Sequence, residues 1–202
     1  RGSGSVARRL ALAELEARLR RQEQGEAGSS VHAAGLSAAR EWTSPFSDLV
    51  RRCPPAEAAV MRDAAIARLV MVMRDGIALP EREPMGLLGV ANARLDAGED
   101  AAALLEPLAA LSNDPHQPTA MRAGALRAMA RDAMRAERWS EAADQSLRLA
   151  REHGTDPSSA AAIGLAVRIA RELDRAADGQ DPASRARLES ALELAVRAFP
   201  EH

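Results

Sequence analysis

The fold is decided by residues 84–115, PMGLLGVANARLDAGEDAAALLEPLAALSNDP, which read as two helices separated by a short turn. The opening proline suits the first position of a helix, where a missing N–H breaks no hydrogen bond. Gly98 follows the first apolar-periodic stretch and can take the left-handed conformation that ends many helices. We therefore predict helices over Pro84–Ala97 and Glu99–Leu111, with a kink or an early end at Pro107, because proline disrupts a helix interior.

Similar punctuation divides the rest of the sequence into helices with short links. Prolines open several apolar-periodic stretches, and two Asp-Pro pairs combine a capping side chain with a proline at the first helical position. The helices predicted before the quoted stretch are Val6–Gln24, Ser30–Trp42, a short one ending at Arg52, and Pro55–Arg74. Those predicted after it are Pro118–Glu137, Trp139–His153, Pro157–Ala177 and Pro182–Phe199.

The composition independently favours an all-α fold. Ala fills 46 of the 202 positions, and hydrophobic residues make up 47% of the sequence, so strong helix formers carry much of the apolar surface. Aromatic and β-branched residues, which sheets favour, are scarce. We therefore predict an all-α protein of stacked antiparallel helical hairpins, a design that tolerates Ala because its core is thin.

Two further hairpins follow the first, starting about 39 and then 34 residues later. Their recurring large and small positions are Leu87, Val90, Ala91, Gly98, Ala103, Ala110 and Pro115, then Leu126, Met129, Ala130, Ala133, Trp139, Ala142 and Leu149, then Ile163, Gly164, Val167, Leu192, Ala195 and Pro200. This pattern resembles the 34-residue tetratricopeptide repeat (TPR) over about residues 84–200. Arg94 and Pro107 depart from it, since the family prefers Tyr and a bulky apolar residue there.

The resemblance implies a right-handed α-α superhelix that serves as a non-catalytic interaction scaffold, binding a partner peptide or protein in a concave groove. Residues 1–5 read Arg-Gly-Ser-Gly-Ser without an initiator Met, as in a tag or linker scar, so we expect a longer natural protein. Residues 6–83 are then an N-terminal region of divergent repeats or a cap, and residues 84–202 the TPR-like repeats. A generic hairpin array or an irregular bundle also fits the pattern.

The most specific polar feature is a row of arginines on the helix predicted from Pro118. Arg127, Arg131 and Arg135 lie opposite its apolar side. In a TPR-like register, these three residues and Asn92 line the concave groove. Guanidinium groups bind carboxylates through paired hydrogen bonds, so the row suits an acidic peptide or the terminal carboxylate of a polypeptide. The alternative is a solvated face whose arginines pair with acids on adjacent helices.

Two apolar stripes predict packing surfaces in the N-terminal region. Leu12, Leu15 and Leu19 form the first stripe, which fits either packing on the next helix or a dimer contact. The second stripe comprises Val60, Ala64, Ala67, Val70 and Met71. Since the helix that carries the second stripe is apolar almost all round, we expect it to be the most buried helix of the protein.

Charge and motif content argue against several classes of function. The net charge of −2 disfavours nucleic-acid binding, and no apolar run is long enough to span a bilayer. There is no His-Glu-x-x-His zinc motif, and a sequence without Lys cannot form a Gly-rich phosphate loop of the P-loop type. Cys53 reads as a small apolar residue, and Glu81 and Glu83 are a weak candidate acid–base pair.

We therefore predict no enzymatic activity, no metal and no cofactor, with a protein or peptide partner. The location is left open, with the cytoplasm favoured over other compartments. Two alternatives remain open at this point. One is an all-α ligand-sensing or regulatory domain with a small apolar pocket between helices, and the other is an α-helical hydrolase or lyase. An enclosed apolar cavity would favour the sensor, whereas titratable groups converging in a cleft would favour the enzyme.

Overall fold

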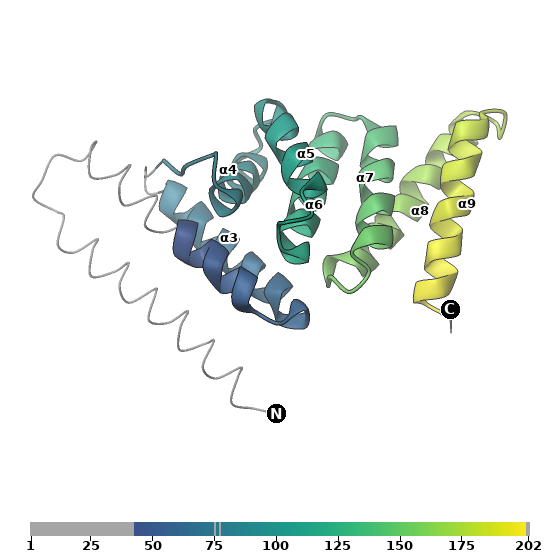
Figure 1. Cartoon of the computed structure of the whole chain (residues 1–202). Helices are drawn as coiled ribbons and strands as arrows, with labels where there is room; N and C mark the ends of the chain where they lie inside the picture. Colours follow the sequence, from purple (N-terminus) through teal and green to yellow (C-terminus); the bar gives the residue numbers. More distant parts are fainter. Residues whose placement is uncertain (1–42, 75, 77, 201–202) are drawn as a thin grey trace, which may run out of the picture.

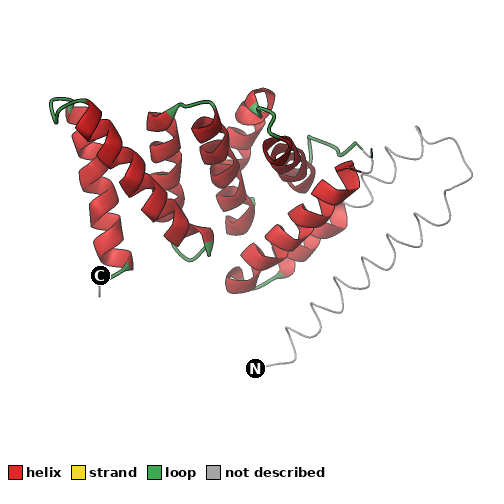
Figure 2. Cartoon of the chain, turned by 180° about the vertical axis from the view of Figure 1, so that it is seen from behind, coloured by secondary structure: helices red, strands yellow, loops and turns green. Residues whose placement is uncertain are grey.

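The computed structural model describes residues 43–74, 76 and 78–200. The helices predicted over Val6–Gln24 and Ser30–Trp42, the leucine stripe and the scar at residues 1–5 lie outside this range. Residues 43–52 are helical. The following elements are α3 (Pro55–Arg74), α4 (Pro84–Ala97), the 3-10 helix η1 (Ala102–Leu104), α5 (Leu105–Asn113), α6 (Thr119–Arg135), α7 (Trp139–Glu152), α8 (Ser158–Ala176) and α9 (Pro182–Ala198). The described residues include no strand, which confirms the all-α class (Figure 2).

The helices lie side by side in one elongated row that follows the order of the sequence from α3 to α9 (Figure 1). Short links, such as residues 136–138 between α6 and α7, leave room only for a reversal of direction, so neighbours run antiparallel. Contacts between helices that are not consecutive join α3 and α4 to α6, and α7 to α9. Helix α6 therefore connects the N-terminal helices to the rest of the row.

Most helix boundaries among the described residues lie at or next to the prolines and glycines that predicted them. The predictions for Pro55–Arg74 and Pro84–Ala97 are confirmed at both ends. Gly98 ends α4 with a φ of 83°, in the left-handed region that glycine enters without strain. At the start of α9, Asp181 accepts hydrogen bonds from the backbone N–H groups of Ala183 and Ser184, as its Asp-Pro pair predicted.

The helix predicted over Glu99–Leu111 is shorter and starts later than expected. The structure has η1 and then α5, which places Pro107 in the first turn of α5. The first N–H groups of a helix have no partner within it, so proline fits there and the kink expected at Pro107 is wrong. In the resulting register Ala103 and Ala110 are exposed, and the core positions go to Leu104, Leu108 and Leu111.

The buried face of α3 also differs from the prediction. Val60, Ala67 and Met71 are exposed, and the core side of α3 is formed by Ala58, Met61, Ala65, Leu69 and Val72. Because the helix is apolar almost all round, its periodicity fits two faces equally well. The helix with the longest continuous buried stretch is α4, in which Met85–Asn92 are all buried.

Candidate functional site

The arginine row is positioned by the amphipathic pattern of α6. Its core side carries Leu126, Met129 and Ala133, all buried against neighbouring helices. The three arginines recur every fourth residue and so follow one another along a single edge of the helix, which borders α3 and α4. The structure therefore places the row beside acidic side chains of those two helices.

Arg127 and Arg131 are engaged by these side chains. Arg127 donates two hydrogen bonds to Asp63 of α3, with N···O distances of 3.1 and 2.7 Å. Arg131 donates to the side-chain oxygen of Asn92 at 2.9 Å and to Asp96 at 2.7 Å. Two of the three arginines thus have partners on adjacent helices, and Asn92 and Arg131 are in direct contact.

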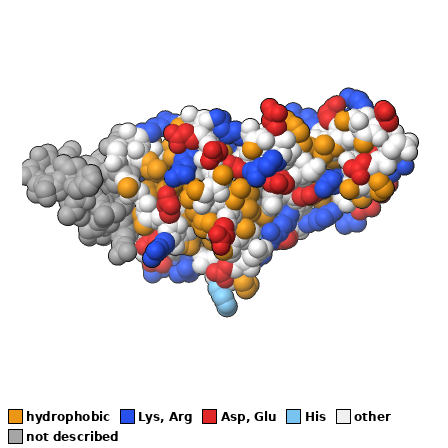
Figure 3. Space-filling model, turned by 90° about the horizontal axis from the view of Figure 1, so that it is seen from above, with side chains coloured by type: hydrophobic (Ala, Val, Ile, Leu, Met, Phe, Trp, Pro, Cys, Tyr) orange, Lys and Arg blue, Asp and Glu red, His pale blue; other side chains and the backbone are white. Residues whose placement is uncertain are grey.

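Arg135, the last arginine of the row, is exposed and has no carboxylate partner among the described residues. It is therefore the member of the row that can take a carboxylate from another molecule without breaking an existing pair. Over the face seen in Figure 3, acidic and basic side chains are interspersed without a large patch of one sign.

An apolar groove of about 510 Å³ lies on α8 and at the start of α7. It is lined by Trp139, Leu165, Arg168, Ile169, Glu172, Leu173 and Ala176. The six α8 residues recur at helical spacing and share one face, and Trp139 is 45% exposed at the first position of α7. Met134, which precedes Arg135 in α6, packs on the same apolar cluster as Leu165 and Leu173. The Arg135 guanidinium, in contrast, lies beside Gly98 at the end of α4 and does not line the groove.

The two charged side chains that line the groove differ in whether they have a partner of opposite charge. Arg168 is exposed and has no acidic partner among the described residues. Glu172, one turn further on, is paired with Arg175, whose Nη1 lies 2.8 Å from a Glu172 oxygen. The groove therefore offers an apolar floor with one available cation, Arg168.

A second polar feature, Arg62, lies inside the molecule and was not predicted from the sequence. Its side chain is fully buried in α3. Nη1 donates to Asp156 and to the backbone oxygen of Ala120, both at 2.7 Å, and Nε donates to Asp63 at 2.9 Å. Arg62 thereby connects α3, the start of α6 and the link before α8. No distinct signal in the sequence marks it, because α3 also carries Glu57, Asp63, Arg68 and Arg74.

The carboxylates bound to Arg62 remain charged in the folded protein. Burial opposes their charged forms, but hydrogen bonds outweigh it. The pKa of Asp63 is lowered through Arg127 and Arg62, and that of Asp156 through Arg62 and Ser158. Asp156 thus caps the first turn of α8, as its Asp-Pro pair predicted, and also neutralises Arg62.

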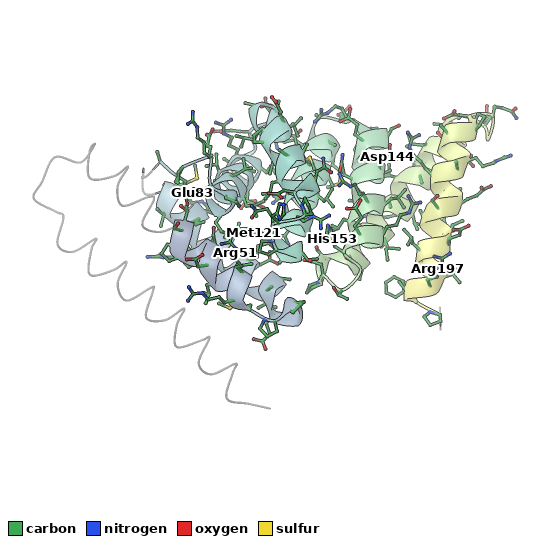
Figure 4. All side chains as sticks on the ribbon, in the orientation of Figure 1. Arg51, Glu83, Met121, Asp144, His153 and Arg197 are labelled. Carbon is green, nitrogen blue, oxygen red and sulfur yellow. The ribbon has the colours of Figure 1, made fainter. Side chains whose placement is uncertain are left out.

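His153 lies close to this network, in the interior of the row between α7 and α8 (Figure 4). It is 2% exposed, and neither ring nitrogen has a hydrogen bond among the described residues. Burial lowers the pKa of His153 below its ordinary value of 6.5, and the positive charges of Arg122 and Arg148 lower it further. Glu152 and Asp156 act in the opposite direction without reversing the shift.

We expect the free energy of unfolding to fall as the pH drops below about 6.5, because the unfolded protein then takes up a proton that folded His153 resists. One such proton changes the free energy of unfolding by at most about 1.4 kcal/mol per pH unit. Urea titrations at several pH values measure how steeply the free energy of unfolding depends on pH. His153→Gln should flatten this dependence below about pH 6.5. An unchanged slope in the variant would assign the pH dependence to another group.

The remaining candidates do not converge. Cys53 is buried, Glu81 is 3.7 Å from Arg94, and Glu83 accepts a hydrogen bond from Thr43. His32 and His202 lie outside the described residues, and within the described ranges no group of His, Cys, Asp and Glu could hold a metal ion. None of the helices described is long and apolar enough to cross a membrane.

Fold and site together define an all-α protein with a partly engaged arginine row on α6 and an apolar groove on α7 and α8. Comparisons of the sequence and structure with protein-family models, with curated proteins and with solved structures gave no match in any of the three. The function is therefore inferred from the protein's own geometry.

Proposed function

We propose that the protein is a non-catalytic, TPR-like interaction scaffold that binds an amphipathic segment of a partner protein in the groove on α7 and α8. The observation that carries this proposal is the exposed indole of Trp139 in an apolar groove. Large exposed apolar side chains that line one concavity are typical of binding surfaces. The helix pairs α4–α5, α6–α7 and α8–α9 are consistent with three TPR-like hairpins.

The partner's apolar side chains would contact Trp139, Leu165 and Leu173, and a carboxylate would reach Arg168. An amphipathic helix suits this arrangement, because it presents apolar anchors at i, i+3 or i+4 and i+7 with charged residues alongside. Since Arg168 has no acidic partner among the described residues, the favoured segment is acidic.

The engaged arginines have a supporting role in this proposal. Arg127 joins α6 to α3 through its hydrogen bonds with Asp63, and Arg131 joins α6 to α4 through its hydrogen bond with Asn92. Both residues therefore stabilise the packing of α6. Reversing the charge of either residue would place it against Asp63 or Asp96 and disturb packing as well as binding. Arg168, which lines the groove, is therefore the cleaner position at which to test recognition.

We expect a helical-peptide library selected on the wild type, and depleted on a Leu165→Glu variant, to yield acidic amphipathic sequences. Binding of a selected peptide should weaken at least tenfold in Leu165→Glu, because a buried apolar contact is replaced by an unpaired charge. Arg168→Glu should weaken it several-fold. Fluorescence anisotropy with a labelled peptide measures these affinities.

Arg151→Glu is the matched control, since Arg151 is exposed on α7 and does not line the groove. This variant should bind like the wild type, and circular dichroism should show equal helicity for all variants. A selection that enriches no peptide, or peptides that bind Leu165→Glu as tightly as the wild type, would refute the groove as the binding site.

A further inference from the structure

The last helix of the described row, α9, carries an apolar stripe with no partner among the described residues. Leu192, Val196 and Phe199 are exposed, Val196 by 70%, and they recur at i, i+4 and i+7. Glu189, Glu193 and Arg197 lie beside them, and Arg197 is 4.0 Å from a Glu193 oxygen. In Figure 4 the labelled Arg197 marks this helix at the outer end of the row. The stripe therefore has the features proposed for the groove's ligand, which are apolar anchors with a carboxylate, Glu189, that has no basic partner among the described residues.

We infer that a second copy of this protein inserts the α9 stripe into the groove on α7 and α8, which rests on the proposed function of that groove. Leu192, Val196 and Phe199 of one copy would meet the apolar floor around Trp139 of the next. Glu189, beside the stripe, would lie towards Arg168. The two surfaces of the same protein are thus complementary in apolar character and in this charge pair.

Pairing of α9 with its own copy is the competing arrangement. Residues close to a two-fold axis lie near their own symmetry mates. Near the midpoint between Leu192 and Val196, Glu193 is already paired with Arg197 of the same helix. The groove is the favoured site because Arg168 has no acidic partner among the described residues, and the variants below separate the two arrangements.

The inferred contact is heterologous, because the groove and the stripe are distinct patches. Each copy would then present one free groove and one free stripe, so assembly can continue from either end. Such contacts generate closed rings or open filaments, depending on the rotation between successive copies. The complex should therefore grow with protein concentration and should not stop at a dimer unless two copies close on each other.

The test is sedimentation velocity over a concentration series, with one variant for each surface. Ala176→Glu places a negative charge at the edge of the groove, and Val196→Glu places one in the stripe. Both positions are exposed, so the fold should be retained and circular dichroism can verify it. The wild type should show a sedimentation coefficient that rises with concentration, whereas each variant alone should remain monomeric.

Sedimentation of a mixture of the two variants is the decisive experiment. The mixture contains one intact groove and one intact stripe, so it should form a one-to-one complex that does not extend. Val60→Glu, which changes an exposed apolar residue of α3, should assemble like the wild type. A wild type that is monomeric up to millimolar concentration would overturn the inference, as would assembly that Val196→Glu abolishes and Ala176→Glu leaves intact. Selected peptides that still bind the wild-type groove would leave the proposed function standing in either case.

Discussion

Replacing Arg62 with Met is expected to lower the free energy of unfolding by about 3–5 kcal/mol, the usual effect of removing one partner of a buried ion pair. The substitution leaves the Asp156 carboxylate buried without its cation and the Ala120 carbonyl without its side-chain donor. It also removes the connection from α3 to the link before α8. Urea denaturation followed by far-ultraviolet circular dichroism measures the loss.

Arg131→Met is the matched control, because it removes the same side chain from a partly exposed pair with Asp96. Its effect should be about 0–1 kcal/mol, as for other surface ion pairs. Adding Asp156→Asn to Arg62→Met should restore part of the stability, since it removes the stranded charge and keeps an acceptor for Ser158. Equal effects of the two Arg→Met substitutions would contradict a structural role for the buried network.

Gly86→Ala is expected to destabilise the protein by about 1–3 kcal/mol through overpacking. A Cβ at Gly86 would lie less than 3.0 Å from the Pro80 carbonyl oxygen, and a backbone atom cannot rotate away as a side chain can. The loop before α4 is packed directly on the first turn of that helix, so either the loop or the helix must move. Thermal and urea unfolding of the variant measure the cost.

Gly164→Ala is expected to change the stability of the protein in the opposite direction. Gly164 is an exposed residue of α8, and a Cβ there would meet nothing within 4 Å among the described residues. Alanine should stabilise the protein by about 0.4–1 kcal/mol, because it restricts the unfolded state without strain in the helix. If both Gly→Ala substitutions stabilise, then the close approach of Pro80 to α4 is incorrect.

The sequence was sufficient for the helix boundaries because proline, glycine and capping residues act locally. Pro55, Pro84 and Gly98 determine where helices begin and end whatever packs around them. The buried face of α3 was not predictable in this way, because an apolar helix offers more than one stripe and only tertiary packing chooses between them. The delayed start of α5 has the same origin. Either the alanines at 103 and 110 or the leucines at 104, 108 and 111 could face the core, and tertiary packing selects the leucines.

The candidate site was predicted in part. The spacing of Arg127, Arg131 and Arg135 placed them on one edge of a helix, but the aspartates that engage two of them come from α3 and α4, far away in the sequence. The groove has no local signature, because its floor is built from ordinary apolar residues of α8 together with Trp139. Whether such apolar residues stay exposed depends on which helices pack over them, and that is a property of the folded protein.

The central claim, that the groove beside Trp139 binds a partner segment, is tested most directly by the fluorescence of that residue. The protein has two tryptophans, so Trp42→Phe leaves Trp139 as the sole indole. Titration with a selected acidic peptide should shift its emission to shorter wavelength and saturate at the affinity measured by anisotropy, and Ala176→Glu should abolish the shift. A peptide that binds with the same affinity and leaves the emission of Trp139 unchanged would contradict the account.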